Sequence, residues 1–159
     1  MPKLDEYDIA ILDLLQANAR ATNVEIAEKV NLSQSPCLRR IRLLEEAGLI
    51  RGYRAELDRQ AVGLELTVFV SFRVIRHSRD TAQEFQDALA RIPEVVAIHM
   101  ISGEADFLAE LVVENLAAYE HLLTEKLLVL QQVTDIRSSF AIRSVKTGGA
   151  LKLPRPAAG

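Results

Sequence analysis

The sequence is short of cysteine, of long apolar runs and of net charge, and each shortage excludes a class of protein. Its 159 residues contain a single cysteine, Cys37, so an internal disulfide and a cysteine-based metal cluster are excluded. No apolar run is long enough to cross a bilayer, and the N-terminus lacks the apolar core of a signal peptide, so we expect a cytoplasmic protein. The formal net charge of −3 argues against indiscriminate binding to nucleic acid.

Motifs for catalysis and cofactor binding are also missing. The sequence has no phosphate-binding glycine loop, no dinucleotide fingerprint and no serine nucleophile motif. Its histidines lack the spacing of metal ligands: His77, His99 and His121. We therefore expect no catalytic residue, no metal and no cofactor, and predict that the protein is not an enzyme. Its composition, with 49% hydrophobic and 26% charged residues, is that of an ordinary globular protein.

The region from 23 to 47 is typical of two helices joined by a tight turn, preceded by a strongly apolar helix over 5–19. Ser33 is a good N-cap for the second helix of the pair, Pro36 falls in its first turn, and Gly48 is placed to end it. Apolar residues recur along this helix at helical spacing and predict a buried stripe of Cys37, Ile41 and Leu44. This pattern predicts a helix-turn-helix, whose second helix enters the DNA major groove.

The side of that helix opposite the stripe is basic. Five arginines and two acidic residues lie between positions 39 and 54 in a chain whose net charge is −3, which is the footprint of phosphate contact. The segment 49–57, with a glycine turn at its centre, predicts a hairpin wing. We expect contacts to base edges from Ser35, Arg39 and Arg42, and contacts to the DNA backbone from Ser33, Gln34, Arg40, Arg51 and Arg54.

The chain changes character after a polar linker at 57–63. Strict alternation of apolar and polar residues over 64–75 predicts a long, half-buried strand. The later segments predict a helix that begins at a capping box on Thr81, two strands joined by a short turn, a second helix and a last strand, over 81–92, 95–102, 107–113, 116–130 and 134–146. This β-α-β-β-α-β order predicts a ferredoxin-like domain with both helices on one face of the sheet.

The expected fold is therefore α+β, with a winged helix-turn-helix domain at 1–56 and a βαββαβ domain at 64–147. Phe69 and Ile75 are apolar residues on the otherwise polar side of the first strand. They predict that the open face of the sheet packs against a second copy of the chain. The residues from 148 to 159 have little to fold with, and we expect a flexible tail or an extended arm.

This arrangement resembles the Lrp/AsnC (feast/famine) family of bacterial and archaeal transcription regulators over nearly the whole chain. Four segments carry the resemblance and are similar in turn to the family's opening helix, recognition helix, wing entry and turn between the second and third strands: 8–12, 33–45, 48–53 and 102–107. The resemblance implies dimers formed through the sheet, which assemble further into octamers or open arrays. It also implies a small effector, often an amino acid, bound between dimers.

The turn that begins at Ser102 offers chemistry suited to an amino acid. A zwitterion needs partners for its carboxylate and for its ammonium group. Backbone N–H groups exposed at Gly103 can serve the carboxylate, and Glu104 or Asp106 can serve the ammonium group. These four residues are the expected effector site. The residues alone leave open the alternative that this stretch is only a hairpin loop.

Two further functions stay open at the level of the sequence. Proteins similar in fold to the family act as siroheme decarboxylases, and such a site requires histidines and arginines that converge on a tetrapyrrole cavity. Here the arginines cluster on the predicted recognition helix and wing, and the histidines are scattered. The other alternative is an architectural DNA-binding protein without an effector. We favour a sequence-specific regulator that binds double-stranded DNA and responds to an amino acid or a similar small metabolite.

Overall fold

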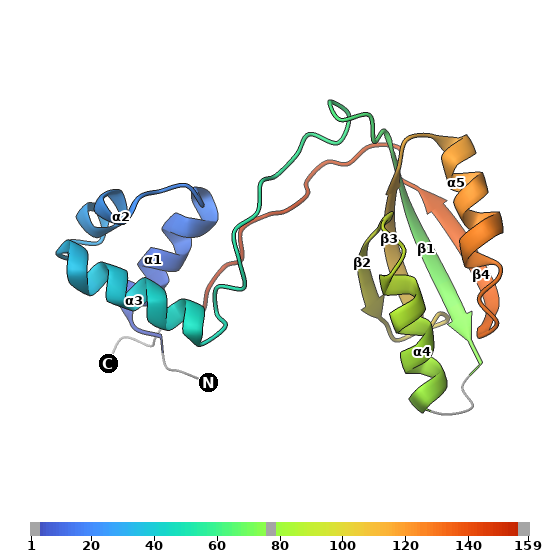
Figure 1. The fold of residues 1–159 in the computed structure, drawn as a ribbon, viewed down its shortest axis with the longest axis horizontal. Coiled ribbons are helices and arrows are strands. Elements are labelled where there is room, and N and C mark those ends of the chain that lie inside the picture. The colour runs from blue at the N-terminus through green and yellow to red at the C-terminus, as the bar shows by residue number, and fades with distance from the viewer. Residues whose placement is uncertain (1–3, 76–78, 156–159) are drawn as a thin grey trace. The chain divides into compact units, whose positions relative to one another are not determined.

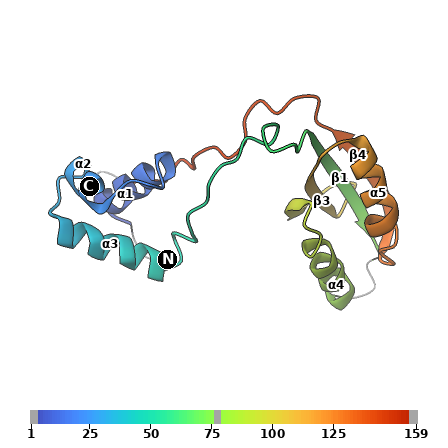
Figure 2. The ribbon, with the colours of Figure 1, turned by 45° about the horizontal axis from the view of Figure 1, so that its top comes forward.

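The computed structural model describes residues 4–75 and 79–155, and His77 lies outside them. The chain divides into two compact units, Met1–Glu56 with Lys146–Gly159, and Leu57–Val145. Figure 1 shows a unit of helices and a unit in which helices pack on a sheet, and Figure 2 shows the same elements from a second direction. The chain therefore begins in one unit, builds the other and returns to the first.

Three helices form the first unit: α1 (Glu6–Ala17), α2 (Asn23–Lys29) and α3 (Gln34–Glu46). The first two begin at capping boxes, in which Asp5 pairs with Asp8 and Thr22 pairs with Glu25. The apolar sides of all three helices meet in one core, formed by Ile11, Ile26, Ala27, Val30, Cys37, Ile41 and Leu44. The buried stripe predicted for the second helix of the helix-turn-helix is thus confirmed.

The ends of α3 are as predicted. Ser33 is the N-cap, with extended backbone, although its side chain makes no capping hydrogen bond. The third helical position is Pro36, which has no N–H to donate to the serine. At the other end, Gly48 has φ +69°, the left-handed conformation that glycine adopts at little cost.

The predicted wing hairpin does not form. The described chain contains no strand between α3 and the sheet, and residues 51–58 are all exposed. A hairpin of two very short strands is marginal in water unless one face packs on something, and an exposed segment has no such support. The helix-turn-helix is followed by an extended connector instead of a hairpin.

The second unit contains a four-stranded antiparallel sheet in the order β2-β3-β1-β4. Its elements are β1 (Leu66–Val74), α4 (Arg79–Ala90), β2 (Val95–Met100), β3 (Phe107–Val113), α5 (Leu116–Leu122) and β4 (Val133–Phe140). The element order confirms the predicted βαββαβ domain and, with the helical unit, the α+β class.

Several boundaries in this unit differ from the predictions: β1 and β2 are each two or three residues shorter than predicted, and three other elements also differ. Helix α4 begins at Arg79, before the predicted cap at Thr81. Helix α5 passes into a π-helical turn at Leu123–Leu127, where a continuous α-helix was predicted. Strand β4 ends at Phe140, which pairs with Val68, and among the described residues only the Ala141 N–H continues the pairing, by donating to the Thr67 carbonyl at 3.0 Å.

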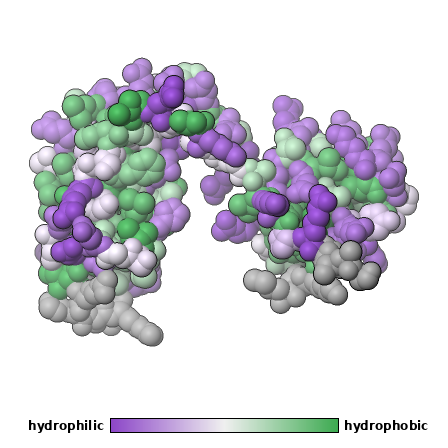
Figure 3. All heavy atoms as spheres, turned by 180° about the vertical axis from the view of Figure 1, so that it is seen from behind, coloured by the Kyte–Doolittle hydropathy of each residue, from purple (hydrophilic) through white to green (hydrophobic). Residues whose placement is uncertain are grey.

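The core of the second unit lies between the sheet and its helices. Val68, Val70 and Phe72 are fully buried, which confirms the predicted alternation along β1. The ring of Phe85 from α4 lies between those of Phe72 and Phe107, with centroid distances of 5.3 and 5.1 Å. Other apolar side chains remain at the surface among polar ones, as the space-filling view shows (Figure 3). One of them is Phe69, on the side of β1 that faces away from the helices.

The C-terminal arm, the described residues 148–155, is held against the first unit. The backbone N–H of Leu151 donates to Gln16 Oε1 at 2.7 Å, and Gln16 Nε2 donates to the Leu151 carbonyl at 3.2 Å. One side-chain amide thus pairs with both backbone groups of Leu151, as a neighbouring strand would. The arm is extended and anchored on α1, which agrees with the second of the two expectations for these residues, an extended arm.

Candidate DNA-binding surface and effector turn

Helix α3 presents its predicted base-contact residues to solvent. Ser35, Arg39 and Arg42 are exposed on the side away from the core, and Ser33 and Gln34 are exposed at its start. Within the described part of the chain, neither Arg39 nor Arg42 has an ion pair or a hydrogen bond. Their guanidinium groups are therefore available to an external acceptor such as a phosphate or the edge of a guanine.

Arg40 differs from its two neighbours on α3. Its Nη1 lies 2.8 Å from Asp5 Oδ2 and 2.7 Å from Asp8 Oδ1, and its guanidinium stacks on the Tyr7 ring at 5.2 Å from the centroid. The hydrogen bond to Asp8, followed by the bond to Asp5, raises the pKa of Arg40. These contacts bind the start of α1 to α3. Arg40 thus serves the fold of the helix-turn-helix, which the sequence did not predict.

Two opposing effects act on the pKa of Asp5, an acidic partner of Arg40. Partial burial disfavours its charged form, but the hydrogen bonds from the Asp8 amide and from Arg40 outweigh burial and lower the pKa of Asp5. The carboxylate therefore stays ionised beside Arg40 at neutral pH. The same carboxylate caps α1 by accepting the Asp8 N–H at 2.9 Å.

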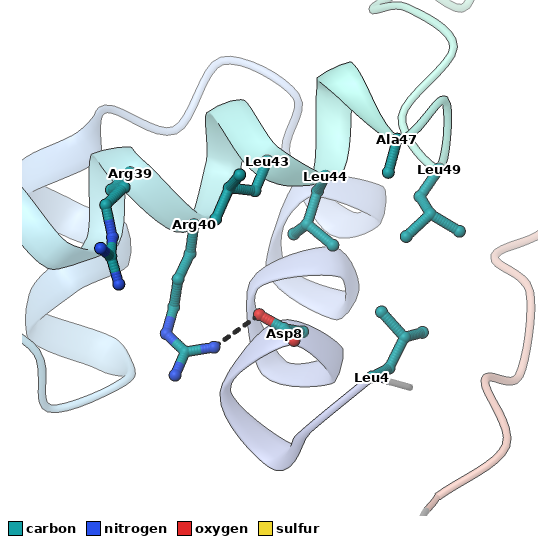
Figure 4. A pocket seen from close by; sticks show the side chains of 8 residues that line it. All are labelled: Leu4, Asp8, Arg39, Arg40, Leu43, Leu44, Ala47 and Leu49. Carbon is teal, nitrogen blue, oxygen red and sulfur yellow. Dashed lines mark hydrogen bonds and ion pairs between the residues drawn. The ribbon is translucent and has the colours of Figure 1, made fainter. Parts of the chain in front are cut away.

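A small cavity of about 260 Å³ lies beside the Arg40–Asp8 pair, between the start of α1 and the second half of α3 (Figure 4). Apolar side chains form most of its wall, and the charged groups stand at one end (Figure 4). The lining residues are Leu4, Asp8, Arg39, Arg40, Leu43, Leu44, Ala47 and Leu49. The ion pair thus closes one end of an otherwise apolar gap between two helices.

The connector after α3 is tied back to that helix. Tyr53 Oη donates a hydrogen bond to Glu45 Oε1 at 2.9 Å. Burial, together with the hydrogen bond to the negatively charged Glu45, raises the pKa of Tyr53. Arg51 and Arg54, on either side of this contact, are exposed and have no ion pair among the described residues. The connector therefore adds two available cations close in sequence to α3, although no hairpin forms.

The predicted effector turn connects β2 to β3. The Ile101 N–H donates to the Asp106 carbonyl at 3.0 Å, and Gly103 has φ +123°, a conformation that glycine reaches without strain. Across the described chain, no acceptor pairs with the N–H groups of Gly103, Glu104 and Ala105. Ser102 is exposed beside them. The turn therefore has backbone donors available to an external anion.

Asp106 is placed differently from the prediction. It is only 8% exposed, its carboxylate accepts the Val74 N–H at 3.0 Å, and its own N–H donates to the Phe72 carbonyl at 2.9 Å. The register of β1 with β4 shifts between Arg73 and Val74. The Asp106 side chain thus satisfies a backbone donor at the irregular end of β1 and fixes the turn to it.

Two arginines that the sequence did not single out hold the tip of this turn. Arg73 Nε and Nη2 donate to the Glu104 carbonyl at 3.0 and 2.7 Å. Arg137 Nη1 lies 3.1 Å from Glu104 Oε2, and its Nε lies 3.2 Å from Asp135 Oδ2. Arg73 and Arg137 belong to adjacent strands, and no local pattern could have revealed that both reach the 102–106 turn. Of the acidic candidates, Glu104 is the one whose carboxylate faces solvent, with its side chain 82% exposed.

Other candidate chemistry finds no support among residues 4–75 and 79–155. No group of three or more histidine, cysteine, aspartate or glutamate side chains there is arranged to hold a metal. Cys37 is buried, and burial raises the pKa of its thiol. Among the same residues, no helix is long and apolar enough to span a membrane.

Known proteins resemble this chain in both units. Residues 4–51 match a winged helix-turn-helix DNA-binding family, and residues 67–151 match the Lrp/AsnC ligand-binding domain. The leucine-responsive regulatory protein of Rhizobium meliloti is 44% identical over 144 residues, which cover 91% of this chain and 92% of that protein. The glutamate uptake regulatory protein of Zymomonas mobilis is 41% identical over 152 residues, which cover 96% of this chain and 92% of that protein.

Solved structures agree with these matches. A transcriptional regulator from Neisseria meningitidis, in complex with L-methionine, is 38% identical and superposes with a TM-score of 0.88 over 94% of this chain and 97% of its own. An AsnC-family regulator from Agrobacterium tumefaciens gives the same TM-score and coverage at 36% identity. The expected resemblance is confirmed in sequence and in fold, and the chain belongs to the Lrp/AsnC family of transcriptional regulators.

Proposed function

We propose that this regulator binds specific sites in double-stranded DNA through α3, and that an amino acid bound at the 102–106 turn changes its DNA affinity. One observation carries the DNA-binding half of the proposal. Arg39 and Arg42 stand side by side on the exposed face of α3 and have no partner among the described residues, although the chain is acidic overall. Exposed arginines that project from one face of a helix fit contacts to guanine and phosphate.

The DNA contacts divide into two roles. Ser35, Arg39 and Arg42 read base edges, and Ser33, Gln34, Arg51 and Arg54 hold the DNA backbone. Arg40 has a third role, because its guanidinium is already engaged by Asp5 and Asp8. It positions α3 against α1 and contacts DNA weakly or not at all, which revises the role predicted from the sequence.

The effector half of the proposal rests on the turn and on the relatives. Ser102, Gly103 and Glu104 supply the polar contacts, and Asp106 maintains the turn's shape through Val74. The relatives are named for responses to leucine or for glutamate uptake, and one solved neighbour binds L-methionine. These names support an amino acid as the effector class. The family resemblance implies a site between dimers, and a ligand bound there changes DNA affinity if it prefers one state of the assembly.

The exposed side of the sheet supports the proposed assembly. Phe69 is exposed on the face of β1 that the helices leave open, and such a face fits a dimer formed by two sheets, with dimers that assemble further into an octamer. We propose no enzymatic activity, since the candidate residues serve DNA and effector binding. A regulator with these partners works in the cytoplasm, where bacterial and archaeal DNA resides.

The test combines DNA binding with a ligand screen. Purified protein is titrated with genomic DNA fragments to select a bound site, and affinity for that site is measured with each of the twenty L-amino acids. We expect nanomolar-range binding to the selected site and a change of about fivefold or more with at least one amino acid. Equal affinity for selected and random DNA would refute sequence specificity. Specific binding that no amino acid alters would support the effector-independent alternative.

A further inference from the structure

We infer that Arg137 and Glu104 form an exchangeable ion pair, in which Arg137 takes the α-carboxylate and Glu104 takes the α-ammonium group of the bound amino acid. This inference rests on the proposed effector function and extends it. From the sequence we expect the backbone N–H groups of the turn to bind the carboxylate of the amino acid, and Glu104 or Asp106 to bind its ammonium group. The structure brings a cation from β4 to the same turn, which supplies the missing side-chain partner for the carboxylate.

The two arginines at the turn are not equivalent. Arg73 donates two hydrogen bonds to the main-chain carbonyl of Glu104. If Arg73 moved to a ligand, the backbone of the turn would lose these bonds. Within residues 4–75 and 79–155, Arg137 is held only by side-chain carboxylates, those of Glu104 and Asp135. A ligand can therefore recruit Arg137 without disturbing the backbone, whereas Arg73 acts as a positioning residue.

The exposure of the pair suits exchange with a ligand from solvent. The Arg137 side chain is 63% exposed and that of Glu104 is 82% exposed. Ion pairs with this exposure contribute little to stability because water solvates both partners. A zwitterionic amino acid carries one positive and one negative group. On binding, its carboxylate replaces Glu104 as the partner of Arg137, and its ammonium group replaces Arg137 as the partner of Glu104. Net charge at the turn is then unchanged on binding.

The acidic alternative at this turn is less suited to the role. Asp106 is buried and its carboxylate accepts the Val74 N–H at 3.0 Å. If Asp106 turned towards an ammonium group, that backbone donor would lose its acceptor in a buried place, which is costly. Glu104 carries the ammonium contact instead. The unpaired N–H groups of Gly103 and Ala105 remain as further donors to the carboxylate.

The experiment measures dissociation constants for each of the twenty L-amino acids by calorimetry or thermal shift, for the full-length protein and its Arg137→Gln variant. Each amino acid that binds is compared with its own α-amide, which lacks the carboxylate charge, and with its α-hydroxy acid, which lacks the ammonium group. We expect either ligand change to weaken binding to the unaltered protein by about 10- to 100-fold, as for loss of a charge-assisted hydrogen bond.

The variants then separate the two roles. Arg137→Gln is expected to bind the amino acid and its α-amide with similar affinity, and Glu104→Gln the amino acid and its α-hydroxy acid. The matched control is Arg91→Gln, an exposed arginine at the end of α4, which keeps the affinities of the unaltered protein. Melting temperatures without ligand check that each variant is folded.

The outcomes distinguish failure of the Arg137 and Glu104 roles from failure of the effector function. Amino-acid binding that Arg137→Gln leaves unchanged, or continued discrimination against the amide by that variant, overturns the role of Arg137 and leaves the effector function standing. If no amino acid binds the unaltered protein, the effector function fails and this inference fails with it. If a folded Arg137→Gln variant loses affinity for the amino acid and for its amide by the same factor, Arg137 maintains the shape of the turn, and the inference is also overturned.

Discussion

Arg40 Nη1 lies 2.7 Å from Asp8 Oδ1, so the middle of the recognition helix is bonded to the first turn of α1. The Arg40 side chain is 30% exposed and that of Asp8 is 17% exposed, which places the pair between a surface and a buried ion pair in strength. The same arginine bonds Asp5 and stacks on Tyr7. One side chain thus joins two helices at three points.

Replacing Arg40 should affect stability first and DNA binding second. We expect Arg40→Ala to lower the free energy of unfolding of the helical unit by about 1–2 kcal/mol, because it leaves two carboxylates without their cation. A double-mutant cycle with Asp8→Ala, measured by chemical denaturation, should give a coupling energy of about 0.5–1 kcal/mol. If Arg40→Ala is as stable as the unaltered protein but lowers the salt dependence of DNA binding, Arg40 is a phosphate contact after all.

The contact between Arg40 and Asp5 should also depend on pH. The pKa of Asp5 is lowered in the folded protein from its ordinary value of 3.8, so the unfolded chain takes up a proton first as the pH falls. The stabilisation is therefore complete well above pH 3.8 and is lost as the pH falls through the lower folded value. Thermal melts of the unaltered protein and of Asp5→Asn should differ at pH 7 and converge as the pH falls below 3.8 and through the lower pKa of the folded protein. A difference that persists at low pH would show that the effect does not come from ionisation of Asp5.

Removal of Arg39 should reduce specificity. Arg39→Ala is expected to weaken binding to a selected site by about 1–3 kcal/mol, the range for loss of a bidentate contact with guanine, and to change binding to random DNA much less. Arg51→Gln is the matched comparison. As a backbone contact, it should weaken both kinds of binding alike and reduce the slope of log K against log salt by about 1. Fluorescence anisotropy at several salt concentrations measures both. An equal effect of Arg39→Ala on selected and random DNA would make it a backbone contact.

Substitution of Asp106 separates a role in shape from a role in binding. Asp106→Ala removes the acceptor of the buried Val74 N–H and should lower the free energy of unfolding by about 1–3 kcal/mol. Asp106→Asn keeps an oxygen acceptor and should recover most of that stability and most of the response to an amino acid. Thermal melts and ligand titrations of both variants measure this. Full stability with no amino-acid binding in Asp106→Asn would instead identify the carboxylate as the ammonium partner.

The C-terminal arm offers a test that leaves both sites untouched. Gln16→Ala removes the two hydrogen bonds that hold Leu151 on α1. We expect faster hydrogen exchange at Leu151 and easier proteolysis of the arm, with a stability loss of at most about 1 kcal/mol, because both bonds are exposed. Glu28→Ala, a change at an exposed residue of α2, serves as the control. Unchanged exchange at Leu151 would mean that the arm is not held by Gln16.

Local features of this protein follow from the sequence alone, because they depend on residues a few positions apart. The stripe of Cys37, Ile41 and Leu44 needs only the helical repeat, and the burial of Val68 and Val70 needs only the alternation of a strand. The left-handed end of α3 at Gly48 is equally local. The same is true of the exposure of Arg39, which follows once the buried stripe is known.

Only the tertiary structure decided which distant groups meet. Arg40 and Asp8 are 32 positions apart, Asp106 and Val74 also 32, and Leu151 and Gln16 135. Several side chains of one chemical type could make such a contact, and their distances and burial in the folded chain determine which of them does. Arg39 and Arg40 look alike in the sequence, but in the structure Arg40 is paired with Asp5 and Asp8, whereas Arg39 has no partner among the described residues. Likewise the acid at the effector turn that faces solvent is Glu104, while Asp106 is occupied within the fold.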